Sequence, residues 1–407
     1  MSLFDKLQPI SDRLDVFAGG PMPFDTVIDS ISSPTEVVIS GRRTLMCGSN
    51  NYFGLSFHPE VIAAAQAAVA REGAGTTGSR AANGSYAAHR RLEKAFAAAY
   101  GKRQAVVFST GYQANLGVIS GLCASGDTVV IDLESHASIY DGARLSGAQM
   151  FAFRHNSAAD LARKLARVEK KANCLVVAEG LYSISGDVGA LKEIAAVCRE
   201  AGVFLMVDEA HSFGVYGERG LGYAEETGVL DSVDFIVGTF SKALAGIGGY
   251  VVSDHESLRL LHFASRPYVF TASGSPANIA GVEVALGILL ADRSLRTRLW
   301  ANVRRVRAGL TAVGFRIGQT ESPIVPIEIG TEEQAVTMWA ALLQAGVYTN
   351  IVLPPACRPD GCLLRTSYSA AHTPEQIDEA LAIFEKVGRA LGVVRFEVRT
   401  QNVEVRI

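Results

Sequence analysis

Lys242 is the side chain in this sequence that is best suited to covalent chemistry. It is the only lysine between Lys192 and Lys386, and it follows the apolar run 234–237 within a segment of Gly, Thr, Ser and Ala residues. These small neighbours are not typical of a solvated surface and suit an amine that is shielded from water. A desolvated amine is neutral often enough to attack a carbonyl, which a protonated ammonium cannot do. The pattern therefore indicates Schiff-base chemistry at Lys242.

Asp208 and His211 occupy a matching place in the chain. Both follow the apolar run 203–207, and Lys242 follows the next such run, so all three are expected where strands end. A carboxylate keeps a pyridinium nitrogen protonated, an imidazole binds a phenolic oxygen, and an amine holds an aldehyde. Together these three groups match the needs of an electron-sink cofactor.

Further candidates follow the neighbouring predicted strands. A phosphate requires hydroxyls and the backbone N–H groups of a helix start. The residues expected to supply them are Gly111, Tyr112, Thr239 and Ser241. His136, at the end of another apolar run, has the flat ring needed to stack on a cofactor. Because ligands collect where parallel strands end, we expect these loops to share one crevice.

The order of the apolar runs predicts an α/β fold. Short β-branched runs alternate with helical segments, which indicates a mostly parallel central sheet with helices on both faces. The expected strands are 105–108, 128–132, 174–179, 203–209 and 234–238. The expected parts are an N-terminal arm (1–60), a large α/β domain (61–275), a smaller C-terminal α+β domain (276–394) and a strand-like tail of unknown role (395–407).

Composition and charge argue against several other classes. The 407 residues carry a net charge of −3, which provides no basic field for nucleic acid. The DEAH segment 208–211 also occurs in helicases, but their GxxxxGK[ST] phosphate loop is absent. The six cysteines lack the paired spacing of a zinc site, so no metal is expected. No apolar run approaches the roughly 20 residues that span a bilayer.

These observations favour a cytoplasmic enzyme with at most peripheral contact with the inner membrane surface. The basic helical segment 294–310 is most simply a solvated face, with a membrane-surface or carrier-protein contact as the alternative.

Five motifs together resemble the α-oxoamine synthases: DEAHSFG, GTFSKALAGIGGY, STGYQAN, SHAS and EGLYSISGD. The similarity covers residues 40 to 390. Members of this family are fold-type I pyridoxal 5'-phosphate transferases that condense an amino acid with an acyl thioester and release carbon dioxide. Ser241, the block 266–273 and the segment 354–365 resemble the branch that joins L-serine to a palmitoyl-type thioester. That reaction gives 3-ketosphinganine, the first step of sphingolipid biosynthesis.

The resemblance implies a role for each candidate. Lys242 would bind the cofactor and move the Cα proton, Asp208 would pair with the pyridine nitrogen, and His211 would bond the phenolic oxygen. His136 would stack on the ring and contact the substrate carboxylate. The remaining expected contacts are Gly111, Tyr112, Ser183, Thr239 and Ser241 to the cofactor, Thr271 from the partner subunit of a homodimer with a shared active site, and Arg365 and Asn51 to the substrate.

Two alternatives stay open. Another α-oxoamine synthase, such as 8-amino-7-oxononanoate synthase or an enzyme that uses glycine or alanine, would share this chemistry. Glycine-using relatives usually carry Gly where this chain has Ser241. A non-catalytic fold-type I protein that serves as an interaction module is the second alternative, and the complete set of candidates argues against it. The acyl chain length, and coenzyme A or acyl carrier protein as the thioester carrier, also stay open.

Overall fold

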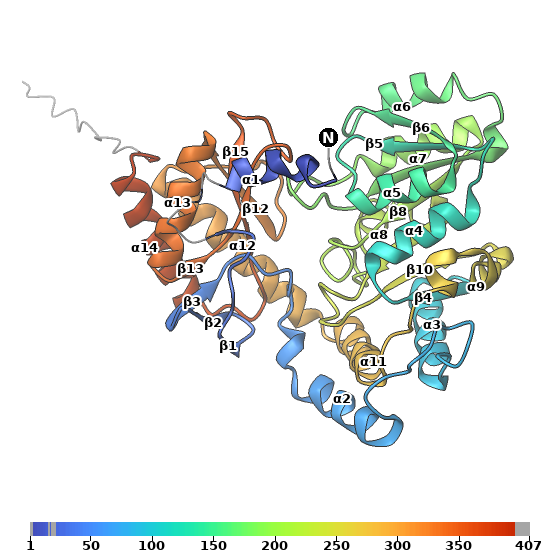
Figure 1. Cartoon of the computed structure of the whole chain (residues 1–407), viewed down its shortest axis with the longest axis horizontal. Helices are drawn as coiled ribbons and strands as arrows, with labels where there is room; N and C mark the ends of the chain where they lie inside the picture. Colours follow the sequence, from blue (N-terminus) through green and yellow to red (C-terminus); the bar gives the residue numbers. More distant parts are fainter. Residues whose placement is uncertain (1–2, 15–16, 18–21, 395–407) are drawn as a thin grey trace, which may run out of the picture.

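The chain folds into two lobes, one built on a large sheet and one containing the C-terminal helices and smaller sheets (Figure 1). The computed structural model describes residues 3–14, 17 and 22–394. The predicted tail, 395–407, with its strand-like pattern, lies outside the described residues.

Within the described residues, a seven-stranded sheet forms the centre of the large lobe. Its strands are β4 (Gln104–Phe108), β5 (Thr128–Asp132), β6 (Gln149–Phe153), β7 (Cys174–Glu179), β8 (Phe204–Asp208), β9 (Phe235–Thr239) and β10 (Gly249–Ser253). They lie in the order β4-β10-β9-β8-β7-β5-β6. Strands β9 to β6 in this order pair in parallel, and β10 is antiparallel to both neighbours. The predicted α/β class with a mostly parallel sheet is confirmed.

Helices cover both faces of this sheet, because the strands are apolar on both sides. Side chains alternate along each strand. In β7, Leu175 and Val177 lie in one buried cluster, and Val176 and Ala178 lie in another. The first cluster includes residues of α4 (Gly111–Leu122), α5 (Ala137–Ser146) and α9 (Leu261–Ala264). The second includes residues of α3 (Ala87–Tyr100), α6 (Ala158–Leu165), α7 (Leu191–Ala201) and α11 (Pro276–Ala291).

The smaller lobe combines two four-stranded sheets with long helices, as far as the described residues go. Its strands are β1 (Ser30–Ser33), β2 (Glu36–Ile39), β3 (Arg42–Met46), β11 (Arg316–Ile317), β12 (Ile324–Gly330), β13 (Val347–Tyr348), β14 (Asn350–Val352) and β15 (Cys362–Ser367). One sheet has the order β1-β2-β3-β13 and the other β11-β12-β15-β14. The helices are α12 (Arg293–Val313), α13 (Glu332–Gln344) and α14 (Pro374–Ala390).

Segments far apart in the sequence share the two cores. Val37 and Leu45 of the predicted arm lie in the same cluster as Trp339 of the smaller lobe. Conversely, α11 packs on α2 (Pro59–Glu72), and its Leu286 joins the core of the large lobe. The predicted domain boundaries stay a prediction. Other short helices are η1 (Asp5–Leu7), α1 (Gln8–Leu14), η3 (Leu55–Phe57), η4 (Lys171–Asn173), α8 (Tyr223–Glu226), η5 (Leu230–Ser232), η6 (Glu256–Leu260) and α10 (Arg266–Val269).

Helix α12 carries the arginines of the predicted basic segment. Arg304 pairs with Glu321 at 2.7 Å, and Arg305 pairs with Asp378 at 2.5 Å. These exposed ion pairs fit the interpretation of a solvated face. Of the helices in the described part of the chain, none combines the length and the apolar character needed to cross a membrane.

Arg80, in the glycine-rich loop that precedes α3, forms a buried ion pair. Its Nη2 lies 3.0 Å from Glu93 Oε1, and both side chains are almost completely buried. The exposed Arg90 also pairs with Glu93, at 3.0 Å. Loss of one partner from a buried pair leaves an uncompensated charge, which costs far more than loss of an exposed partner.

We therefore expect Arg80→Ala to lower the free energy of unfolding by about 3 kcal/mol. The matched variant Arg90→Ala removes an exposed partner of the same carboxylate, and we expect it to cost less than about 1 kcal/mol. Equilibrium unfolding in urea measures both values. Equal losses of unfolding free energy in the two variants would contradict the expectation that the buried Arg80–Glu93 pair contributes more to stability than the exposed Arg90–Glu93 pair.

Candidate active site

A cavity of about 280 Å³ opens at the carboxyl ends of β8 and β9. The strand order explains its position, because β7, β8 and β9 are neighbours and their carboxyl ends lie at one edge. Most of the predicted site residues line this cavity. They are Gly111, Tyr112, His136, Asp208, His211, Thr239, Ser241 and Lys242.

Lys242 and Asp208 place an amine and a carboxyl group in the same cavity. Desolvation by the surrounding protein lowers the pKa of Lys242, and the charge of Asp208 acts in the opposite direction. The Asp208 carboxylate is fixed from two sides: Oδ2 accepts a hydrogen bond from Asn115 Nδ2 at 2.7 Å, and Oδ1 accepts one from the N–H of Ala210 at 2.8 Å. The cavity thus contains an amine with a lowered pKa and a carboxylate whose orientation is fixed.

His136 caps the N-terminus of α5, and this role fixes its tautomer. Its Nδ1 accepts a hydrogen bond from the backbone N–H of Ser138 at 3.2 Å and lies 2.7 Å from the Ser138 hydroxyl. Desolvation lowers the pKa of His136, so the ring is neutral. Because a backbone N–H can only donate, Nδ1 is the acceptor and Nε2 carries the proton. His136 can therefore donate one hydrogen bond from Nε2.

His211 is buried and is also neutral. Burial, followed by the charges of Lys242 and Arg365, holds its pKa well below the ordinary value. Its Nδ1 lies 2.7 Å from the hydroxyl of Tyr52, which orients the ring. The other ring nitrogen is then free to take part in the chemistry of the cavity, where His211 is one of the lining residues.

The start of α4 and the end of β9 form an anion cradle. Thr110 caps α4 by accepting a hydrogen bond from the N–H of Gln113 at 3.1 Å. Position 111 must be glycine, because a Cβ there would lie 2.6 Å from Thr239 Oγ1. Thr239 and Ser241 place their hydroxyl oxygens 2.9 Å apart beside this turn. Free helix N–H groups and paired hydroxyls are the groups that bind phosphate.

Arg365 lies outside the cavity lining and is held by two acceptors. Its Nε donates to the carbonyl of Ser183 at 2.5 Å, and its Nη2 donates to Asn50 Oδ1 at 2.9 Å. Asn51 donates instead to the hydroxyl of Ser56 at 2.7 Å. Asn50 therefore contacts the arginine, whereas Asn51, the predicted substrate-binding residue, contacts Ser56. The substrate and cofactor roles of Arg365, Ser183 and Asn51 stay predictions.

Thr271 lies beside the anion cradle within its own chain. Its hydroxyl accepts a hydrogen bond from Gln113 Nε2 at 3.1 Å, in the first turn of α4. Thr271 does not line the cavity. Its predicted contact across a homodimer stays a prediction.

Four polar residues of the cavity were not predicted from the sequence: Thr110, Asn115, Ser138 and Glu179. Asn115 orients Asp208 and also donates to Ser138 at 2.9 Å. Glu179 accepts a hydrogen bond from the backbone N–H of His136 at 2.5 Å, and burial followed by Asp208 raises its pKa well above the ordinary value. The available signal was position, because Glu179 ends β7 as Asp208 ends β8.

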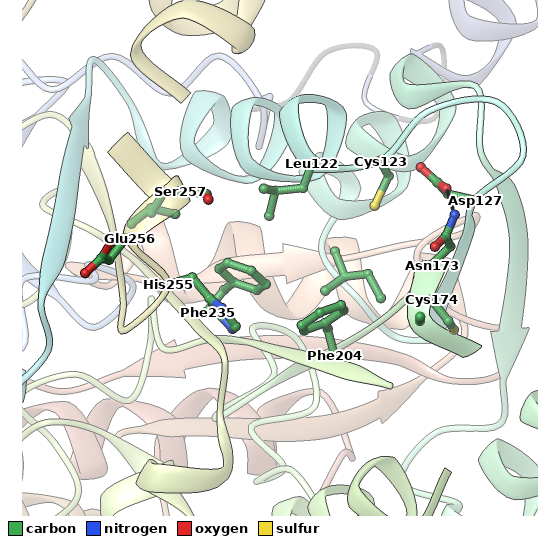
Figure 2. A pocket seen from close by; sticks show the side chains of 13 residues that line it. Leu122, Cys123, Asp127, Asn173, Cys174, Phe204, Phe235, His255, Glu256 and Ser257 are labelled. Atoms are coloured by element: carbon green, nitrogen blue, oxygen red, sulfur yellow. Dashed lines mark hydrogen bonds between the residues drawn. The ribbon is translucent and has the colours of Figure 1, made fainter. Parts of the chain in front are cut away.

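A larger cavity, of about 420 Å³, lies at the opposite edge of the sheet. Figure 2 shows it lined by Phe204, Phe235 and Cys174, which begin β8, β9 and β7. It contains none of the predicted catalytic groups. Among the described residues, no cluster of His, Cys, Asp or Glu could hold a metal ion.

Comparison with known proteins places this geometry in a family. Residues 44–384 match the model of aminotransferase class I and II. The chain belongs to the aminotransferase class I and II family. A serine palmitoyltransferase of Caulobacter vibrioides is 51% identical over 97% of this chain and 98% of its own length. A solved structure of SPT with a PLP internal aldimine covers 97% of this chain and 100% of its own, with 44% identity and a TM-score of 0.94.

The chain is also similar to 8-amino-7-oxononanoate synthases, the alternative that the sequence left open. An 8-amino-7-oxononanoate synthase of Pelobacter propionicus is 39% identical over 88% of this chain and 92% of its own length. It is less similar than the serine palmitoyltransferase of Caulobacter vibrioides. The predicted fold-type I architecture and the predicted place among the α-oxoamine synthases are confirmed.

The histidine environments predict a measurable difference in protonation. We expect the rings of His136 and His211 to titrate below the ordinary pKa of 6.5, because desolvation lowers both pKa values. His155 is the internal control: burial alone would lower its pKa, but Asp132 and nearby carboxylates raise it overall. NMR of histidine-labelled protein measures each titration. Protonation of His136 or His211 above pH 6.5 would contradict the neutral assignment.

Proposed function

We propose that this protein is a pyridoxal-phosphate-dependent acyltransferase that condenses L-serine with a long-chain acyl thioester. The products are 3-ketosphinganine, carbon dioxide and the free thiol of the carrier. The observation that carries the proposal is Lys242, an amine with a lowered pKa in a cavity that also holds a fixed carboxylate and two neutral histidines. The similarity to serine palmitoyltransferases supports the choice of substrates.

The cavity fits pyridoxal phosphate by the chemistry of its lining. Asp208 suits a protonated ring nitrogen, because each of its oxygens is already held by a donor and cannot turn away. The buried Asn115 Oδ1 has no hydrogen-bond partner within the described residues, so the cavity also offers an acceptor. The turn at Gly111 with Thr239 suits a phosphate. When bound, the cofactor supplies an electron sink for the bonds at Cα.

The protein's own groups then divide the work. Lys242, with its lowered pKa, is the nucleophile toward a carbonyl and the group that takes and returns the Cα proton. His136, with its proton on Nε2, donates toward the serine carboxylate. Arg365 adds a planar guanidinium for the same carboxylate, held in place by Ser183 and Asn50. These contacts select which bond at Cα is cleaved.

The partners follow from the same proposal. The amino donor is L-serine, and the acyl donor is an acyl-CoA or an acylated carrier protein. Two copies of the chain form a homodimer with a shared active site, to which Thr271 of the second copy contributes. The reaction takes place in the cytoplasm, with at most peripheral contact with the inner membrane surface.

Covalent attachment of the cofactor tests the role of Lys242. We expect the wild-type protein mixed with pyridoxal phosphate to show visible absorbance, and borohydride to fix the cofactor on the peptide that contains Lys242. Lys242→Ala should lose both signals, because Lys242 is the only lysine among the described residues that line the cavity. The exposed Lys192→Ala is the matched control and should keep them. Attachment to another lysine in the wild type would contradict the assignment.

Product analysis tests the substrates. We expect wild-type protein supplied with palmitoyl-CoA to release carbon dioxide and a 3-ketosphinganine from L-serine. We expect it to turn over glycine and L-alanine at least about tenfold more slowly, because both lack the serine hydroxyl and one polar contact to that group gives a specificity of this size. Mass spectrometry of the products measures the three rates in parallel. Faster turnover of glycine or alanine would replace this function with that of another α-oxoamine synthase.

A further inference from the structure

The segment that joins β14 to β15 brings two cysteine side chains together. Cys357 lies within this connection, and Cys362 is the first residue of β15. Their Sγ atoms are 3.9 Å apart. All six cysteines of the chain lie in the described residues, and none of them forms a disulfide there. Because a disulfide joins two sulfurs at roughly 2 Å, a small adjustment of the two side chains brings these sulfurs to bonding distance.

A turn between the two cysteines explains this contact. The N–H of Gly361 donates to the carbonyl of Arg358 at 2.9 Å, which closes a four-residue turn. Pro359 and Gly361 stand at the positions where such a turn favours proline and glycine. Cys357 and Cys362 are the residues directly before and after this turn, and the pairing of β15 with β12 holds Cys362 in place. The fold therefore sets the two thiols side by side.

The two thiols differ in their access to solvent. Cys362 is 1% exposed, whereas Cys357 is partly exposed. Both line a cavity of about 610 Å³. The charged residues in the lining of this cavity have both signs: Glu134, Arg316, Glu328, Arg358 and Asp360. Cys357 is therefore the sulfur that a dissolved reagent reaches first, and Cys362 lies behind it.

The remaining cysteines do not suit reaction with a dissolved reagent. They are buried, and burial raises the pKa of each thiol, to about 11 for Cys174 and to about 12 for Cys47, Cys123 and Cys198. The thiolate is the reactive form of cysteine, so a buried thiol that stays protonated is inert. Thiol chemistry is therefore expected at the pair after β14 and not in the two cores.

We propose that Cys357 and Cys362 form a redox modification site, at which a small-molecule disulfide such as oxidised glutathione converts the two thiols into an intramolecular disulfide. Cys357 loses its proton and attacks one sulfur of the reagent, whose S–S bond breaks, and the first reagent thiol leaves with a proton. Cys362 then loses its proton, attacks Cys357 Sγ and expels the second reagent thiol. The protein gives up two electrons and two protons, and the reagent takes them up.

The new bond closes a ring over residues 357–362 and ties the connection to the start of β15. A cross-link acts mainly by restricting the open conformations of a segment. Thiols in a reducing compartment reverse the reaction, as is usual for transient, redox-sensing disulfides. The redox state of the surroundings therefore controls how freely this wall of the cavity moves. The site acts independently of the proposed condensation reaction.

Mass spectrometry of protein treated with oxidised glutathione tests the site. We expect wild-type protein to lose two thiols and to gain a cross-link between Cys357 and Cys362, and dithiothreitol to restore both thiols. Cys357 should react at least about tenfold faster than each cysteine of the cores, because a buried, protonated thiol does not attack. Glutathione that stays on Cys357 of the wild type without a cross-link, or equal reaction at the core cysteines, overturns the proposal.

Single variants test the order of the two steps. Cys362→Ser should stop with one glutathione on Cys357, because the second attack is lost, and Cys357→Ser should gain neither an adduct nor a cross-link. Cys123→Ala is the matched control and should keep the cross-link. Circular dichroism checks that each variant is folded, and the wild-type measurement does not depend on them. An adduct on Cys362 in Cys357→Ser would contradict the proposed order.

Hydrogen exchange tests the effect of the bond on the connection. The N–H groups of Ala356 and Gly361 close turns within it. We expect both to exchange more slowly in the oxidised than in the reduced protein, while the N–H groups of β5 keep their rates. Equal exchange at Ala356 and Gly361 in the two states would show that the redox state does not control this segment.

Discussion

The structure depends on one constraint: the ionisable amine of Lys242 lies among charged groups that are partly removed from water. Removal of a charged group from water is costly unless a partner compensates for it. Here Asp208 supports the charged form of Lys242, while desolvation favours the neutral form. The amine can therefore change protonation state during a reaction. The neighbouring His136 and His211 stay neutral and add no positive charge beside Lys242.

The register of the central sheet brings these ionisable groups together at the ends of neighbouring strands. Glu179 at the end of β7 lies directly opposite Asp208 at the end of β8, and Asp208 lies opposite Val237 of β9. Two carboxyl groups at adjacent strand ends cannot both ionise easily, which is one reason that the pKa of Glu179 is raised. Lys242 is the third residue after β9 and is separated from it by Phe240 and Ser241. All six residues of β7 and all five residues of β9 are buried, so packing on both faces of the sheet holds the ends of these strands in place.

Sequence reasoning identified the parts of the site that lie close to strand ends and missed those that depend on packing. The predicted strands 128–132 and 174–179 agree with β5 and β7 to the residue. Strands β6 and β10 were not predicted: β6 is a partly exposed edge strand, and β10 is a short reversed strand whose place depends on pairing with β4 and β9. Likewise, Asn115 acts through a contact with Asp208, 93 residues away. Such contacts leave no local pattern.

The most direct test of the account is the pH dependence of cofactor capture by Lys242. Only a neutral amine attacks an aldehyde, so the rate of pyridoxal phosphate attachment reports the pKa of this group. We predict an apparent pKa below the ordinary lysine value of 10.5, and a still lower value in Asp208→Asn, because Asp208 supports the charged form. An apparent pKa at or above 10.5, unchanged by Asp208→Asn, would contradict it.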